Sequence, residues 1–230
     1  LVHGAWHGSW CWRKILPALW AKGHRAFAVT LTGLGDRVHL MSPAIRLATH
    51  IDDVAAVIET EELTRIVLVG HSFAGMLVTA VADRYPDRIA HLVYLDAIVP
   101  HSGESWSSFH DESARATRRA SIARDGVLAP PPASAFGLAG EDAAWVDRRQ
   151  RPQPGGGYED VLHFDEARVA SLPRTFVDCT SPALPAIEKS RKRVRSEPGW
   201  QVLEIATGHD PMISAPTQLL EILEQAAHSK

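Results

Sequence analysis

The chain has 230 residues, of which 45% are hydrophobic and 22% are charged, so it can bury the core of one α/β domain with an insertion. Its net charge of −3 gives no basic surface for nucleic acid or an anionic membrane, and no apolar run approaches the roughly 20 residues that span a bilayer. The two cysteines, Cys11 and Cys179, lack metal-ligand spacing and make no disulfide framework. We therefore expect no metal, no nucleic-acid partner and no membrane partner.

The first quarter of the chain predicts alternating strands and helices. Leu1–Gly8 has the pattern of a strand end followed by a Gly-rich turn, Trp10–Trp20 that of a helix and His24–Leu31 that of a strand. The loop Thr32–Asp36 has two glycines but lacks the third glycine and the following helix of a dinucleotide-binding fingerprint. Apolar residues recur at helical spacing over Leu47–Leu63.

A strand–turn–helix centred on Ser72 carries the most informative motif. Ile66–Val69 is a short apolar run, mostly β-branched, which predicts a strand buried on both faces of a parallel sheet, and a helical pattern starts at Met76. The connecting Gly-His-Ser-Phe-Ala-Gly resembles a nucleophile elbow, which holds a serine in a strained turn and needs small residues two positions before and after it. Gly70 fits this requirement, and Ala74 fits it imperfectly.

Residues 97–170 differ in character from the rest. Proline and glycine clusters interrupt short helical patterns at Glu112–Arg124 and Asp142–Arg149. Such a segment is typical of a lid, a common place for substrate contacts and mobility. We therefore expect a helical lid at 97–170 inserted into a core formed by residues 1–96 and 171–230.

The last part of the chain returns to the alternating pattern. Arg174–Thr180 and Trp200–Ala206 predict strands, and the second of them ends shortly before His209. Thr217–Ala227 predicts the closing helix. The basic run Lys189–Arg195 predicts one solvated helix face.

Polar groups gather where the predicted strands end. Strands and helices alternate throughout, which predicts a doubly wound, mostly parallel sheet that binds ligands beyond the carboxyl ends of its strands. The turn at Ala5, Ser72, Asp96 at the end of the strand that starts at Ile89, and His209 all follow such ends. We expect these four groups to converge on one site.

Four sequence blocks carry a resemblance to a known family: Leu1–Trp10, Gly70–Gly75, Val177–Thr180 and Gly208–Met212. The chain resembles the α/β-hydrolases, and more narrowly the plant methyl-esterase and hydroxynitrile-lyase family with its bacterial esterase relatives, some of which cleave pyrethroids. The resemblance spans nearly the whole chain, and the order nucleophile, acid, histidine agrees with it.

The resemblance implies a role for each site residue. Ser72 would be the nucleophile and His209 the base, and the backbone amides of Ala5 and Phe73 would form the oxyanion hole. These roles would make the chain a serine esterase without a cofactor, forming an acyl-enzyme on a small to medium hydrophobic ester.

The catalytic acid departs from the family pattern. In the family it follows the Cys-Thr strand at the position held here by Pro182, whose neighbours offer no carboxylate either. Asp96 is the preferred replacement, because it ends the strand after the elbow, and Asp178 within the Cys-Thr strand is the alternative; an acid from elsewhere also stays open. We predict an Asp96 carboxylate oxygen within about 3.2 Å of His209 Nδ1.

Aromatic residues are the candidates for the substrate pocket and the lid. They are Trp6, Phe73, Trp106, Phe109, Phe136 and Trp145, although each is individually more often plain core packing. A small-molecule ester is the expected partner, a homodimer stays open, and a cytoplasmic location is expected. The chain starts at Leu1 without a methionine, so a preceding signal peptide also stays open.

Other functions on the same scaffold are alternatives. The hydroxynitrile-lyase pattern has a threonine before the oxyanion turn and a lysine after the histidine, where this chain has Gly4 and Asp210. A non-catalytic ligand receptor could keep the whole triad, and a cofactor-free dioxygenase also stays open. Dehalogenase or epoxide-hydrolase chemistry would require aspartate in place of Ser72.

Overall fold

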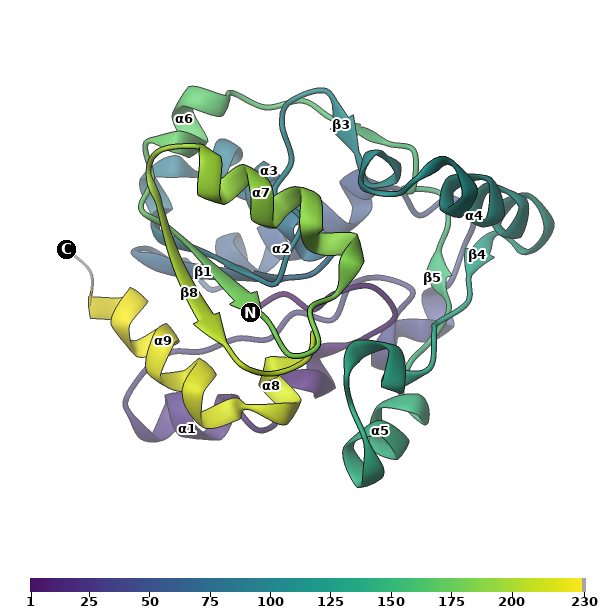
Figure 1. The fold of residues 1–230 in the computed structure, drawn as a ribbon. Coiled ribbons are helices and arrows are strands. Elements are labelled where there is room, and N and C mark those ends of the chain that lie inside the picture. Colours follow the sequence, from purple (N-terminus) through teal and green to yellow (C-terminus); the bar gives the residue numbers. More distant parts are fainter. Residues whose placement is uncertain (229–230) are drawn as a thin grey trace.

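A parallel four-stranded sheet forms the centre of the computed structural model, which describes residues 1–228 (Figure 1). Its strands, in spatial order, are β1 (Ile66–His71), β2 (Ile89–Leu95), β7 (Arg174–Cys179) and β8 (Trp200–Ile205). Each neighbouring pair is parallel, so the carboxyl ends of all four strands lie at one edge. The predicted α/β fold with a parallel sheet is confirmed.

Helices cover both faces of this sheet. The α-helices of residues 1–228 are α1 (Leu16–Ala21), α2 (Leu47–Thr60), α3 (Ala74–Arg84), α4 (Glu112–Asp125), α5 (Gly140–Asp147), α6 (Glu166–Ala170), α7 (Glu188–Ser196), α8 (Pro211–Ser214) and α9 (Pro216–His228). Figure 1 shows α2, α3 and α7 on one side of the sheet and α1 and α9 on the other. Along β2, Leu92 and Tyr94 join the apolar cluster of α2 and α3, while Val93 and Leu95 join that of α1 and α9. Burial on both faces explains why β1 and β2 are mostly apolar.

The segment between β2 and β7 adds short elements outside the main sheet. They are the antiparallel pairs β3 (Glu104–Ser105) with β6 (Val161–Leu162) and β4 (Val127–Leu128) with β5 (Gln153–Pro154). Short 3₁₀ helices lie in this segment at Trp106–Phe109 and Ala133–Phe136, and elsewhere in the chain at Ser9–Trp12, Gly35–Leu40, Pro86–Arg88 and Pro185–Ile187. Apart from α4, the elements of 97–170 are thus short; the role of this segment as a lid stays a prediction.

Two predicted elements are wrong in their extent. In His24–Leu31 only Val29 makes a strand-type bridge, to Val2, because Leu1 and Val2 alone pair with this stretch. The helix expected over Trp10–Trp20 is a 3₁₀ turn followed by α1, with Pro17 in the first turn of α1, where its missing N–H is tolerated.

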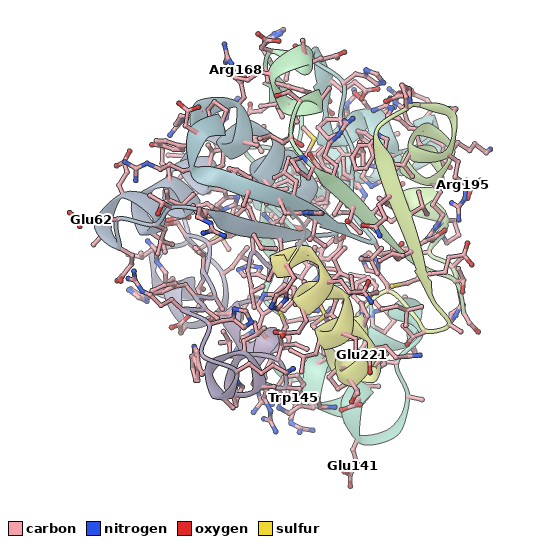
Figure 2. The ribbon with its side chains drawn as sticks, turned by 90° about the vertical axis from the view of Figure 1, so that its left-hand side faces the viewer. Glu62, Glu141, Trp145, Arg168, Arg195 and Glu221 are labelled. Carbon is pink, nitrogen blue, oxygen red and sulfur yellow. The ribbon has the colours of Figure 1, made fainter. Side chains whose placement is uncertain are left out.

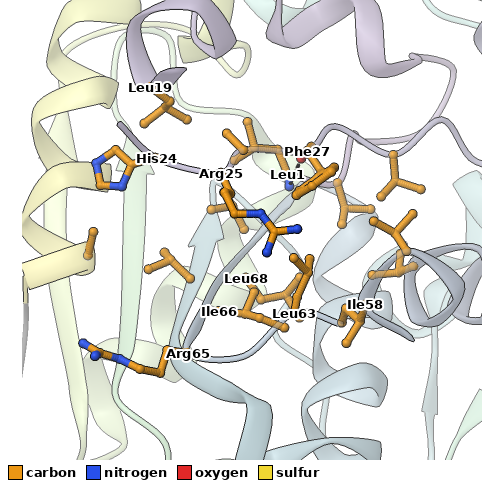
Figure 3. Close-up of a pocket in the computed structure, with 18 of the residues that line it drawn as sticks. Leu1, Leu19, His24, Arg25, Phe27, Ile58, Leu63, Arg65, Ile66 and Leu68 are labelled. Atoms are coloured by element: carbon orange, nitrogen blue, oxygen red, sulfur yellow. Dashed lines mark hydrogen bonds between the residues drawn. The ribbon is translucent and has the colours of Figure 1, made fainter. Parts of the chain in front are cut away.

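A cavity of about 410 Å³ lies beside the amino-terminal half of β1. Figure 3 shows it lined by Leu1, Phe27, Ile58 and Ile66, among others. Since Ser72 follows the opposite, carboxyl end of β1, this cavity is separate from the predicted site. Within residues 1–228, no helix is long and apolar enough to cross a membrane.

Candidate active site

Ser72 occupies a sharp turn between β1 and α3. Its φ of +56° lies in the left-handed region, which costs energy for a residue with a side chain and recurs at functional sites. The Ser72 carbonyl accepts hydrogen bonds from the amides of Gly75 and Ile98, which close the turn. A Cβ on Gly75 would lie 1.8 Å from the Ile98 carbonyl oxygen, so only glycine fits there. The strict demand for a small residue therefore falls on Gly75, one position beyond the predicted Ala74.

The structure brings Ser72, His209 and Asp96 into one hydrogen-bonded row. His209 Nε2 lies 2.8 Å from Ser72 Oγ, and His209 Nδ1 lies 2.6 Å from Asp96 Oδ2. The second distance agrees with the predicted limit of about 3.2 Å. Asp96 is fully buried directly after β2 and, like Ser72, has a positive φ, of 39°. The strain at both residues is consistent with backbone held in place for function.

Asp178 makes other contacts. Its two carboxylate oxygens accept hydrogen bonds from Arg191 Nε at 2.5 Å and Arg195 Nη2 at 2.5 Å, both from α7. The prediction of a wholly solvated basic face over Lys189–Arg195 is wrong at Arg191, whose side chain is only 7% exposed. Of the two predicted acids, Asp96 is the one in contact with His209.

The predicted oxyanion loop lies directly against the nucleophile. A Cβ on Gly4 would come within 2.8 Å of Ser72 Cβ, so this approach requires glycine. Among residues 1–228, the amides of Ala5 and Phe73 have no acceptor in the protein. Two free amide donors beside a serine can serve an oxyanion.

Aromatic rings surround this row. Phe136 lies 5.5 Å from His209 and 6.2 Å from Trp6, and Trp106 lies 4.7 Å from Phe73 and 6.1 Å from Trp6, all between ring centroids. The guanidinium of Arg118 on α4, which the sequence analysis did not single out, lies 5.7 Å from the Trp6 ring and 5.4 Å from the Trp106 ring. Trp6, Phe73, Trp106 and Phe136 therefore form one aromatic group in contact with His209, and their role as pocket residues stays a prediction.

The other two predicted pocket residues have their rings covered by cations. Lys189 Nζ lies 4.7 Å from the Phe109 ring centroid. Trp145 is partly exposed, lies toward the outside of the molecule (Figure 2), and packs against Arg13 and Arg149 at 4.6 and 4.7 Å. These contacts explain both residues without a ligand.

A buried histidine–aspartate cluster next to His209 was missed at the sequence level. His7 Nε2 lies 3.3 Å from Asp210 Oδ2, and His71 Nε2 donates to the His209 carbonyl at 2.8 Å. Burial alone would lower the pKa of His7, but Asp210 outweighs it and raises this pKa above its ordinary value. Burial would raise the pKa of Asp210, but His7 lowers it to about 2. The pair therefore ties the oxyanion loop to the loop of His209.

Replacing Asp210 by asparagine should lower the free energy of unfolding by about 3 kcal/mol, because it leaves His7 buried without its counter-charge. The pKa of Asp210 is lowered in the fold, so its contribution is present above about pH 4 and lost as the pH falls towards 2. The pKa of His7 is raised, so its contribution is present below about pH 6.5 and lost as the pH rises through the folded value.

Urea unfolding at several pH values measures this difference, which should be largest between about pH 4 and pH 6.5. Asp142→Asn is the matched control, because Asp142 pairs with Lys14 at the exposed surface. An Asp210→Asn effect no larger than the control's, at every pH, would refute the ion pair.

Comparisons with known proteins identify the family of this chain. The sequence profile of the Alpha/beta hydrolase family matches residues 1–222. A carbendazim hydrolyzing esterase from Nocardioides sp. (strain SG-4G) is 39% identical, over 97% of this chain and 96% of that protein. Methylesterase 3 from Arabidopsis thaliana is 28% identical, over 99% and 95%. The predicted resemblance to plant methylesterases and bacterial esterases is confirmed.

Solved structures show the same fold. An extracellular alpha/beta-hydrolase from a Paenibacillus species superposes with a TM-score of 0.85 at 18% identity, over 99% of this chain and 98% of that one. The pyrethroid hydrolase PytH superposes with a TM-score of 0.76 at 22% identity, over 99% and 96%. At these identities the likeness concerns the fold alone.

Proposed function

The chain belongs to the alpha/beta hydrolase family, and from this premise we propose that it is a serine esterase whose catalytic triad is Ser72, His209 and Asp96. The observation that carries the proposal is the continuous hydrogen-bonded row from Asp96 through His209 to the Ser72 hydroxyl. The match to a carbendazim hydrolyzing esterase and to plant methylesterases supports ester hydrolysis as the reaction.

The reaction proceeds in two halves. In the first, His209 Nε2 takes the Ser72 proton as Ser72 Oγ bonds to the ester carbonyl carbon, and the amides of Ala5 and Phe73 donate to the oxyanion. Asp96 holds the Nδ1–H tautomer of His209 and stabilises the imidazolium. The imidazolium then protonates the departing alcohol, which leaves an acyl group on Ser72.

In the second half, water replaces the alcohol. Neutral His209 takes a proton from water, the resulting hydroxide attacks the acyl carbon, and the acid leaves as the proton returns to Ser72. The proton transfers between Ser72 and His209 use a contact that the fold already supplies, and no metal or organic cofactor enters the scheme.

We propose a small to medium hydrophobic ester as substrate. The rings of Trp6, Trp106 and Phe136 beside the triad support this choice, because aromatic walls favour apolar ligands. The elements of 97–170 supply Trp106 and Phe136, which supports the proposed role of this segment as a lid over the site.

A lyase reaction fits these residues poorly. Gly4 lies against Ser72 without room for the side chain that the lyase pattern requires. Asp210 replaces the lysine of that pattern, and its carboxylate is paired with His7.

No group of three or more histidine, cysteine or acidic side chains that could hold a metal occurs in residues 1–228.

Steady-state turnover of p-nitrophenyl acetate, p-nitrophenyl butyrate and carbendazim, with mandelonitrile as the lyase substrate, tests the proposal. We expect hydrolysis of at least the two p-nitrophenyl esters and no release of cyanide. A stoichiometric adduct without turnover would instead indicate a ligand receptor. Cyanide release exceeding ester hydrolysis would indicate a lyase.

A further inference from the structure

Arg191 on α7 joins the two carboxylates that the sequence offers as catalytic acids. Its Nη2 donates to Asp96 Oδ1 at 2.7 Å, and its Nε donates to Asp178 Oδ1 at 2.5 Å. The Leu184 carbonyl accepts a hydrogen bond from Nη1 at 2.7 Å, so each of the three guanidinium nitrogens has an acceptor. Asp96 thus divides its oxygens: Oδ2 contacts His209 and Oδ1 contacts Arg191.

These three ionic side chains lie in the interior. The exposed fractions of Asp96, Arg191 and Asp178 are 0%, 7% and 3%. Burial alone would lower the pKa of Arg191, but the carboxylates of Asp96 and Asp178 raise it above its ordinary value. An arginine held this way is always charged, so its removal would leave Asp96 buried without a counter-charge and Asp178 paired with Arg195 alone.

The charges of this group are balanced without His209. Asp178 is also bonded to Arg195, so the two carboxylates and the two guanidinium groups carry no net charge while His209 is neutral. Without Asp178, Arg191 would neutralise Asp96 by itself and weaken the field that Asp96 exerts on His209. Asp178 therefore shares the charge of Arg191 with Asp96.

We propose that Arg191 is a positioning residue of the esterase site: it fixes the Asp96 carboxylate toward His209 Nδ1 while Asp178 balances its charge. This inference rests on the proposed esterase function. Asp96 needs such a support because it follows β2 on strained backbone, with a φ of 39°. With Oδ1 bonded to Arg191, Oδ2 of Asp96 accepts the hydrogen bond from His209 Nδ1–H.

The network continues to the surface through α7. Arg195, one helical turn after Arg191, donates to Asp178 Oδ2 at 2.5 Å and to Glu204 Oε1 at 2.9 Å. Its side chain is 42% exposed and lies at the outer edge of the molecule (Figure 2). Asp178 is thus held from two sides, which fixes the position of Arg191 in turn.

The test compares three variants with the wild type. Arg191→Met combined with Asp178→Asn removes one charge of each sign and keeps the net charge of the group, whereas Arg191→Lys keeps the charge but loses the planar fork. Lys192→Met is the matched control, because Lys192 is the next residue of α7 and is 76% exposed. The readouts are thermal unfolding, kcat and KM for p-nitrophenyl butyrate, and the low-field proton resonance of His209 Nδ1–H.

The double variant is expected to unfold near the wild-type temperature, to keep its KM, and to lose kcat roughly 10- to 100-fold. Its low-field resonance should broaden or disappear. Arg191→Lys should lie between wild type and double variant in both kcat and resonance, and Lys192→Met should match the wild type.

Wild-type kcat and an unchanged resonance in the double variant would show that Arg191 acts only in folding. If the double variant does not fold, Arg191→Lys decides: a wild-type kcat and resonance would overturn the inference, and a reduced kcat with a shifted resonance would support it. If the wild type hydrolyses no ester, the proposed function fails. A resonance that still responds to Arg191→Lys would then show that Arg191 positions Asp96 all the same.

Discussion

Replacing Ser72 by alanine is expected to lower kcat/KM for p-nitrophenyl butyrate by about 10⁴-fold or more. The triad acts as a unit, so His209 and the oxyanion amides have no nucleophile to assist once Oγ is absent. The stability of the fold should change little, because the hydroxyl contributes chemistry and little packing. The hydrogen bonds that close the turn are made by the backbone carbonyl of residue 72, which alanine keeps.

Matched measurements separate chemistry from folding in this variant. Thermal unfolding of Ser72→Ala should remain close to that of the wild type. Ser196→Ala is the control, since Ser196 ends α7 at the exposed surface, where its hydroxyl bonds only to a backbone carbonyl. A Ser72→Ala variant that retains a tenth of the wild-type activity would show that another residue is the nucleophile.

Replacing Asp96 by asparagine should lower kcat by roughly 10³- to 10⁴-fold. Asparagine keeps the shape of the side chain, but its amide group favours the wrong tautomer of His209 and cannot stabilise the imidazolium. The effect should fall on kcat more than on KM, because Asp96 contacts His209 at 2.6 Å and is fully buried from substrate.

Asp178→Asn is the informative comparison for this variant. Asp178 holds Arg191 rather than His209, so its loss should cost at most about tenfold in kcat, together with some stability as a buried partner is removed. Steady-state kinetics of both variants give the ranking. If Asp96→Asn barely changed kcat, or if Asp178→Asn lowered kcat more than Asp96→Asn does, the catalytic acid would be Asp178 on the Cys-Thr strand.

The site could be predicted from the sequence where its residues follow strand ends. Ser72 and Asp96 each come directly after a buried apolar run, and parallel strands bring their carboxyl ends to one edge. The family resemblance, with Pro182 in place of the usual acid, left Asp96 and Asp178 as candidates, and the place of each residue along its strand favoured Asp96. This is why the contact between Asp96 and His209 was foreseen without coordinates.

Contacts set by the orientation of a helix could not be predicted in the same way. The run containing Arg191 has the composition of a solvated face, and only the rotation of α7 about its axis turns Arg191 inward. The spacing of Arg191 and Arg195, one turn apart, was a usable signal once Asp178 was known to lie on a neighbouring strand. His7 and Asp210 were missed because they meet only when two loops 203 residues apart come together.

Short local elements depended on tertiary context too. Val29 lies in a stretch with strand-like composition, yet that stretch makes a single strand-type bridge, to Val2. The position of Gly75 required knowledge of the Ile98 carbonyl, which no local pattern contains.

Covalent labelling of the wild-type protein by a fluorophosphonate, followed by peptide mapping, tests the central claim most directly. We predict one phosphonyl group per chain, on Ser72, with loss of esterase activity in proportion to labelling. Labelling of a different residue, or a protein that hydrolyses esters while remaining unlabelled and fully active, would contradict the assignment of Ser72 as the nucleophile of a serine esterase.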